Sequence, residues 1–330
     1  MATIREVAKL AGVSPATVSR VINGTAKVDE RKRQAVLAAI SETGFKPNEL
    51  ARALFKHSSK IIGVIIPDIE NPFFSEAAKA IEVEAFNQGY KILLCYSDHS
   101  PEKEAINIQM LVQMKADGII IMTNGEDTGK NIANCDLPIV VMDRRFTSGK
   151  KVASIEADHY KGGWLAAEHL IQCGCKKIIC LRAPQKYSSS QERYRAYLDI
   201  CKKYDREPLF LDCDYSYESG LIAAKQIMAY HPDADGILAS NDIAAMAVYK
   251  ILTQAGYKIP DDIQLVGFDD ISFSWRFTPE LTTIHQPIYE MGQKAVQLIL
   301  KDTANQENLI LDVSLIERQT TRRTKGGYIK

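Results

Sequence analysis

The sequence predicts an α/β protein that consists of an all-α helix-turn-helix headpiece followed by two doubly wound parallel-sheet subdomains. The first observation is a pair of short amphipathic helices that meet at a glycine near the start of the chain. The second is an alternation of apolar runs and helical stretches from residue 61 onward, and the third is that this alternation occurs twice. Alternation of this kind is typical of a parallel sheet covered by helices on both faces.

The first helix is predicted because apolar residues recur on one of its faces, namely Ile4, Val7, Ala8 and Ala11. Gly12 then provides the permissive backbone that a sharp turn between helices requires. Ser14 is a suitable N-cap for the second helix, and Pro15 occupies its first position, where a missing N–H costs nothing. A third helix is predicted to follow and to end before Phe45.

The second helix presents a small, polar and cationic outer face, made of Ala16, Thr17, Ser19, Arg20 and Asn23. Such a face suits base edges and phosphates, and Arg20 can make a bidentate contact with guanine. The alternative is a three-helix module that serves packing only. The coincidence of turn, cap and exposed arginine favours DNA binding.

Charge is distributed unevenly along the 330 residues, although the formal net charge is zero. Residues 1–60 contain 11 Lys and Arg against 5 Asp and Glu, whereas the remainder contains 30 against 36. Positive charge is therefore concentrated where the helix-turn-helix lies, as expected of a phosphate-binding surface.

No apolar segment resembles a signal peptide or a membrane span, so we expect a cytoplasmic protein without membrane contact. The number of cysteines is odd, at seven. Several of them lie in or beside apolar runs, which favours reduced core thiols over a disulfide framework.

The segment 47–60 is predicted to be a hinge helix and linker between the headpiece, 1–46, and the larger domain, 61–330. Pro47 ends one element and Asn48 can cap the next, which leaves a helix of about two turns that is too short to be stable alone in water. A two-fold partner together with a DNA groove would support it. The alternative is that Leu50, Ala51 and Leu54 pack on the neighbouring domain.

The larger domain is predicted to contain two α/β series. The first has strands at Ile61–Ile66, Ile92–Tyr96, Gly118–Met122 and Ile139–Met142, with helices near Ser75–Gln88, Glu104–Met114 and Thr128–Asn134. The second has strands at Lys177–Leu181, Leu209–Asp212, Gly236–Ala239 and Gln264–Phe268, with helices near Lys161–Gln172, Ser190–Lys203, Tyr217–Tyr230 and Asp242–Ala255. A final helix, Pro287–Lys301, and strand, Leu309–Thr320, are expected to return to the first series. This gives an N-subdomain of about 61–159 and 287–321 and a C-subdomain of about 160–286.

A ligand site is expected between these subdomains, because ligands of open parallel sheets sit at the carboxyl ends of the strands. Polar residues follow several predicted strand ends, namely Asn71, Asp143, Arg144, Asn241 and Asp269. Amides, carboxylates and guanidiniums suit the hydroxyls of a free sugar, and the rings of Phe73 and Phe74 suit its apolar C–H face. The alternatives are a surface ion pair for Asp143 and Arg144 and turn chemistry for Asn241 and Asp269.

An enzyme is not expected from the motifs of this chain. The segment Gly125–Asn131 has one residue too few between its glycines for a phosphate-binding loop and ends in Asn instead of Ser or Thr. No strand leads into a G-x-G-x-x-G motif, and the six histidines stand at no spacing that suggests a metal site or a catalytic triad. We therefore expect no cofactor and no metal. A transport-type binding protein, the other alternative, would lack residues 1–56 and carry a signal peptide.

Motifs along nearly the whole chain resemble those of the LacI family of bacterial repressors. They are MATIREVAKLAGVSPATVSRVIN, PNELARAL, ENPFF, VVMDRR, ILASNDIAAMAV, LVGFDD and LTTIHQP. The resemblance implies a homodimer whose paired headpieces read a palindromic operator in double-stranded DNA, with hinge helices in the minor groove and Leu54 wedged between base steps. The DNA-binding residues that it implies are Thr3, Ser14, Ala16, Thr17, Arg20, Asn23, Asn48, Ala51, Leu54 and Phe55.

The larger domain is similar in turn to periplasmic ribose-binding proteins. The ligand-binding residues that this similarity implies are Asn71, Phe73, Phe74, Asp143, Arg144, Arg193, Tyr215, Asn241, Asp269 and Gln286. Tyr215 departs from the pattern, because the ribose binders have Phe there. The resemblance implies a repressor of a sugar-utilisation operon that a sugar inducer, ribose or a close relative, releases from DNA. Another monosaccharide or polyol, or a purine corepressor stacked on Phe73 and Phe74, is the alternative.

Overall fold

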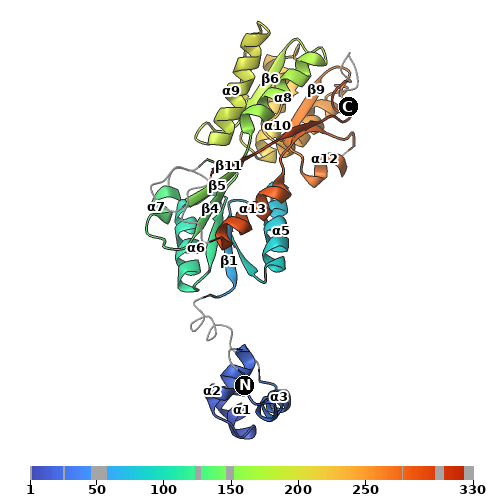
Figure 1. Ribbon diagram of the computed structural model, residues 1–330. Coiled ribbons are helices and arrows are strands. Elements are labelled where there is room, and N and C mark those ends of the chain that lie inside the picture. Colours follow the sequence, from blue (N-terminus) through green and yellow to red (C-terminus); the bar gives the residue numbers. More distant parts are fainter. Residues whose placement is uncertain are drawn as a thin grey trace. The chain divides into compact units, whose positions relative to one another are not determined.

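A computed structural model describes residues 2–24, 27–45, 58–122, 128–145, 152–276, 278–301 and 308–322. The chain divides into two compact units, Met1–Ser59 and Lys60–Lys330 (Figure 1). Most of the predicted hinge helix, with Asn48, Ala51, Leu54 and Phe55, lies outside the described residues.

The first unit is the predicted helix-turn-helix headpiece, with α1 (Ile4–Leu10), α2 (Pro15–Asn23) and α3 (Glu30–Thr43). Gly12 adopts a φ of +65° in the turn, a conformation that favours glycine. The backbone N–H of Thr17 donates to Ser14 Oγ at 3.3 Å, so Ser14 is the N-cap of α2 as predicted. The small core that holds the three helices together consists of Val7, Ala8, Val18, Val36 and Ala39.

The second unit contains two sheets, each of six strands among the described residues. All strands of the first sheet are parallel, in the order β11 (Asn308–Leu311), β5 (Val152–Ala157), β4 (Ile139–Met142), β3 (Gly118–Ile121), β1 (Ile61–Ile66) and β2 (Lys91–Tyr96). Apolar side chains of α5 (Pro72–Asn87) and α13 (Ile288–Leu300) pack on one face of this sheet. Helices α6 (Pro101–Gln113) and α7 (Thr128–Ile132) lie on the other side of the sheet (Figure 1). Their apolar side chains pack on that face.

The second sheet has the order β12 (Ser314–Ile316), β10 (Thr282–His285), β9 (Gln264–Asp269), β8 (Gly236–Leu238), β6 (Ile178–Arg182) and β7 (Leu209–Asp212). Its strands are parallel except for β12, which is antiparallel to β10. One face is covered by α8 (His159–Gln172) and α9 (Ser188–Lys203), and the other by α10 (Tyr217–Tyr230) and α11 (Asp242–Gln254). A short helix, α12 (Ser272–Arg276), follows β9. Two doubly wound sheets confirm the predicted fold class.

The end of the chain differs from the prediction. The expected single strand at residues 309–320 is two strands, because the chain leaves the first sheet after β11 and joins the second at β12. The backbone N–H of Leu265 in β9 also donates to the carbonyl of Thr320. Residues 314–322 therefore belong to the second subdomain, and the predicted N-subdomain, which included residues up to 321, is too long at this end.

The described chain crosses between the two sheets three times, after β5, after β10 and after β11. The backbone N–H of Asp158 donates to the carbonyl of Leu311 at 2.8 Å, so two of the crossing segments are joined. These crossings hold the carboxyl ends of both sets of strands next to each other.

All seven cysteines lie within the described residues; none forms a disulfide, and six are buried. Every helix that the structure describes is too short or too polar to span a lipid bilayer.

Candidate functional site

A cleft of about 440 Å³ lies between the two subdomains of the larger unit. Of the ten predicted ligand-binding residues, nine line it: Asn71, Phe73, Phe74, Asp143, Arg144, Arg193, Tyr215, Asn241 and Asp269. The tenth, Gln286, lies directly behind the lining, where its Nε2 donates to Asp269 Oδ1 at 2.7 Å. The structure therefore brings together residues from strand ends of both sheets.

The aromatic side of the cleft is formed by the first turn of α5. This helix begins at Pro72, three residues earlier than predicted, because Asn71 caps it by accepting from the N–H of Phe73 at 3.0 Å. The rings of Phe73 and Phe74 are buried and meet edge to face, with centroids 5.3 Å apart. They offer an apolar surface to one side of a ligand.

Asp143 and Arg144 follow β4 and face the second subdomain. Asp143 has a φ of +75°, in the left-handed region, and its Oδ2 is 3.9 Å from Arg144 Nε. The Arg144 guanidinium lies 3.6 Å from the ring centroid of Tyr187, which precedes α9. Within the described residues, Asp143 Oδ1 is buried without a hydrogen-bond partner. Because an unpaired buried acceptor is costly, a ligand hydroxyl donating to this atom would be favourable.

Arg193 from α9 is the main cation on the opposite side. Its Nη1 donates to the carbonyl of Ser240 at 3.0 Å, and its Nη2 is 3.9 Å from Asp269 Oδ1. The guanidinium lies 3.5 Å from the ring centroid of Phe268. It also contacts the imidazole of His159.

Carboxyl groups in the cleft and behind its lining are buried, and burial changes their pKa values. Burial raises the pKa of Asp143 to about 6 and that of Asp242 to about 7, and it also raises the pKa of Asp269. Asp269 has a φ of +119°, which is a strained conformation for a residue with a side chain. Among the described residues, Gln286 Oε1 has no hydrogen-bond partner. Acceptors of this kind suit hydroxyl donors.

Asn241 shows the turn chemistry that the sequence left as an alternative. Its Oδ1 accepts from the N–H of Ala244 and so caps α11, while its Nδ2 donates to the carbonyl of Tyr215. The residue still lines the cleft. Sequence reasoning missed Tyr187 and His159; Tyr187 also follows a strand end, after β6, so the same rule could have found it.

Some predicted DNA-binding residues of the headpiece are exposed, whereas others form hydrogen bonds within the headpiece. Ala16 and Arg20 are exposed on α2. The hydroxyl of Thr17 lies 3.0 Å from that of Ser14, and Asn23 Nδ2 donates to Ser19 Oγ at 3.2 Å. Thr3 caps α1 in a reciprocal arrangement with Glu6.

A helix-turn-helix headpiece joined to a two-subdomain cleft defines a class of protein, the DNA-binding regulator with its own ligand-binding domain. Residues 3–48 match the family described as bacterial regulatory proteins, lacI family. Residues 59–319 match the family described as periplasmic binding proteins and sugar binding domain of LacI family. The chain belongs to the LacI family. It is a DNA-binding transcriptional repressor with a sugar-binding domain, and not an enzyme.

Two relatives illustrate the range of the family. The chain is 37% identical to the ribose operon repressor of Bacillus subtilis, over 98% of this chain and 99% of that protein. It is 34% identical to the HTH-type transcriptional repressor PurR of Photobacterium profundum, over 91% of this chain and 92% of that protein.

Solved structures agree with the fold. The Lac repressor dimer bound to operator and the anti-inducer ONPF is 28% identical, with a TM-score of 0.87 over 97% of this chain and 98% of that one. A LacI family transcriptional regulator from Enterococcus faecium with bound ribose is 28% identical, with a TM-score of 0.71 over 79% of this chain and 98% of that one.

Proposed function

We propose that this protein represses a sugar-utilisation operon in the bacterial cytoplasm and that ribose, bound in the cleft, releases it from its operator. The observation that carries the proposal is the grouping of nine predicted ligand-binding residues around one cleft. The roles of these residues in binding are part of the proposal.

The donor and acceptor set supports a sugar. Asp143 and Asp269 offer carboxylate acceptors, Arg144 and Arg193 offer planar donors, and each pair has one member on either side of the cleft. Ribose presents hydroxyls that donate and accept around a small ring, and such a ligand can contact both subdomains at once. The ribose operon repressors among the relatives and the ribose-bound structural neighbour support the same sugar.

The headpiece supports operator binding. Arg20 is exposed on α2, the helix that enters the major groove in helix-turn-helix proteins. We propose that two headpieces of a homodimer read a palindromic site, while the segment around Leu54 enters the minor groove between them. The Lac repressor dimer bound to operator supports this arrangement.

Dimer formation is supported by exposed apolar side chains of the first subdomain. Strand β2 is at the edge of its sheet, and Leu94 and Tyr96 on it are exposed. Ile106 and Val112 on α6 and Phe86 on α5 are exposed as well. Exposed apolar groups on an edge strand and on the helices that contact it are typical of a surface that another protein covers.

A purine corepressor is the competing ligand, since Phe73 and Phe74 could stack on a base and PurR proteins are among the relatives. Calorimetric titration of the full-length protein with ribose, other pentoses, hexoses and purine bases separates the two. We expect ribose to bind and to raise the melting temperature, because a ligand of the native state stabilises it by mass action. Binding of a purine base without binding of any sugar would contradict the proposal.

A further inference from the structure

We propose that His159 is a positioning residue, which fixes the orientation of Arg193 and ties the two sides of the cleft to each other. The inference deepens the proposed function and rests on it in one respect, because Arg193 is taken to contact the sugar. His159 is not among the residues that line the cleft.

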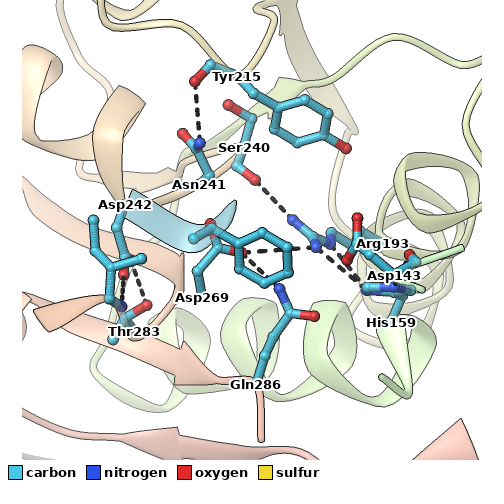
Figure 2. A network of polar contacts seen from close by, with 12 residues as sticks. Asp143, His159, Arg193, Tyr215, Ser240, Asn241, Asp242, Asp269, Thr283 and Gln286 are labelled. Carbon is cyan, nitrogen blue, oxygen red and sulfur yellow. Dashed lines mark hydrogen bonds and ion pairs between the residues drawn. The ribbon is translucent and has the colours of Figure 1, made fainter. Parts of the chain in front are cut away.

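His159 stands where the chain passes from the first sheet to the second. It is the first residue of α8, two positions after β5 ends, and it is 2% exposed. Its Nε2 is 3.3 Å from the backbone carbonyl oxygen of Asp143, in the first subdomain. Its Nδ1 is 3.3 Å from Nη2 and 3.4 Å from Nε of Arg193, in the second (Figure 2). One imidazole therefore contacts one residue on each side of the cleft.

The chemistry of the partners decides the state of the imidazole. A guanidinium has donors and no acceptor, so Nδ1 must accept from Arg193 and cannot carry a proton. The proton then lies on Nε2, which donates to the carbonyl of Asp143. Burial and the neighbouring Arg193 hold the pKa of His159 well below its usual range. Arg144 and Arg145 lower it further, and the Asp143 carbonyl raises it.

All three nitrogen atoms of the Arg193 guanidinium thereby have a contact, and Nη1 and Nη2 each keep a second N–H for a ligand. Nε and Nη2 face His159, Nη1 donates to the carbonyl of Ser240, and the ring of Phe268 supports one flat side. A flexible side chain held in this way loses less entropy when a ligand binds. Without His159, the Nε donor of Arg193 would lose its acceptor and the guanidinium could rotate.

Three variants of the full-length protein test the role. His159→Leu removes both hydrogen bonds, whereas His159→Gln keeps one acceptor and one donor. His169→Leu is the matched control, because His169 lies on the same helix, is also 2% exposed, and bonds to Thr321 instead of a cleft residue. We expect His159→Leu to weaken ribose binding by about tenfold to a hundredfold, the effect of losing a hydrogen bond to a charged group. His159→Gln should recover most of the ribose affinity. His169→Leu should lower the melting temperature but leave the ribose affinity unchanged.

A second measurement needs no ligand. Nitrogen-15 labelling of the histidines, with the His159 signals assigned by their loss in His159→Gln, should show a neutral ring protonated on Nε2 near neutral pH. A charged ring, the opposite tautomer, or unchanged ribose affinity in His159→Leu would overturn the proposal, as would equal weakening in His169→Leu. If the wild type binds no sugar, the proposed function fails, while the NMR signals still decide whether His159 accepts from Arg193.

Discussion

At the scale of single residues, burial determines how the cleft responds to protons. Asp143 is 8% exposed, and one of its carboxylate oxygens has no hydrogen-bond partner among the described residues. Its nearest cation, Arg144, is 3.9 Å away, too far for a direct hydrogen bond. Desolvation therefore outweighs the attraction of the two nearby arginines, and the pKa of Asp143 rises to about 6.

This shift predicts the pH dependence of stability in the ligand-free protein. Because the pKa of Asp143 is higher in the folded state than in the unfolded state, its contribution favours folding at acid pH and is lost as the pH rises through about 6. Asp143→Asn removes this titrating group. The free energy of unfolding of the variant, relative to that of wild type, should therefore rise by about 1 kcal/mol from about pH 5 to about pH 7.5. Urea unfolding at the two pH values measures the difference. If the two proteins differ in free energy of unfolding by the same amount at both pH values, the raised pKa of Asp143 is contradicted.

Single residues also show how far the sequence alone could lead. Asn71, Asp143 and Asp269 were found because polar residues after strand ends converge at one edge of parallel sheets. His159 also follows a strand end, but the strand before it, β5, was not predicted, and its two partners lie 16 and 34 positions away in the sequence. The sequence around a histidine at the start of a helix does not predict contacts of this kind.

At the scale of elements, the close approach of α8 and α9 places Arg193. A Cβ atom added at Gly163 of α8 would lie 2.6 Å from the backbone oxygen of Arg193 and 2.9 Å from its Cα. Backbone atoms cannot move aside as a side chain can, so only glycine permits this helix spacing. The helix that carries Arg193 is thus positioned by a residue without a side chain.

Gly163→Ala should therefore have an effect opposite to that expected from helix propensity. Alanine is favoured over glycine inside a helix by up to about 1 kcal/mol. Here the clash should move α9, lower the free energy of unfolding by about 1–3 kcal/mol and weaken ribose binding. Chemical denaturation and calorimetry check both effects, with Gln172→Ala on the exposed end of α8 as the control. If Gly163→Ala were more stable and its ribose affinity unchanged, α8 and α9 could accommodate a Cβ atom at this position, and the prediction would be wrong.

Element prediction failed where the local pattern was mixed. Strand β5, with the sequence VASIEA, is buried along its whole length and yet contains Ser154 and Glu156, which interrupt the apolar run. The division between β11 and β12 is equally hidden, because both halves have strand-like composition and only the crossing between sheets separates them. Long alternating segments were predicted correctly, since their periodicity alone determines the element type.

At the scale of the whole molecule, we propose that a sugar bound in the cleft releases the protein from DNA. The two subdomains are joined by three crossing segments, and polar groups from both face one cleft. A sugar that contacts both sides favours the arrangement in which they are close together, and a ligand can shift such an equilibrium by its differential affinity for the two states. The proposed hinge helix would be only about two turns long, and a helix of that length is marginal in water. We propose that a change in the spacing of the hinge segments unfolds it.

The most direct test is the operator affinity of the full-length protein as ribose is added, measured by fluorescence anisotropy on a DNA fragment selected with ligand-free protein. Wild type should bind less tightly with ribose, by a factor that corresponds to about 1–3 kcal/mol of coupling. Arg144→Ala and Asp269→Ala should bind the operator normally without responding to ribose, and Arg20→Ala should lose the preference for operator over random DNA. Tighter operator binding in the presence of ribose, or no response of the wild type to any sugar, would contradict the proposed induction by a sugar.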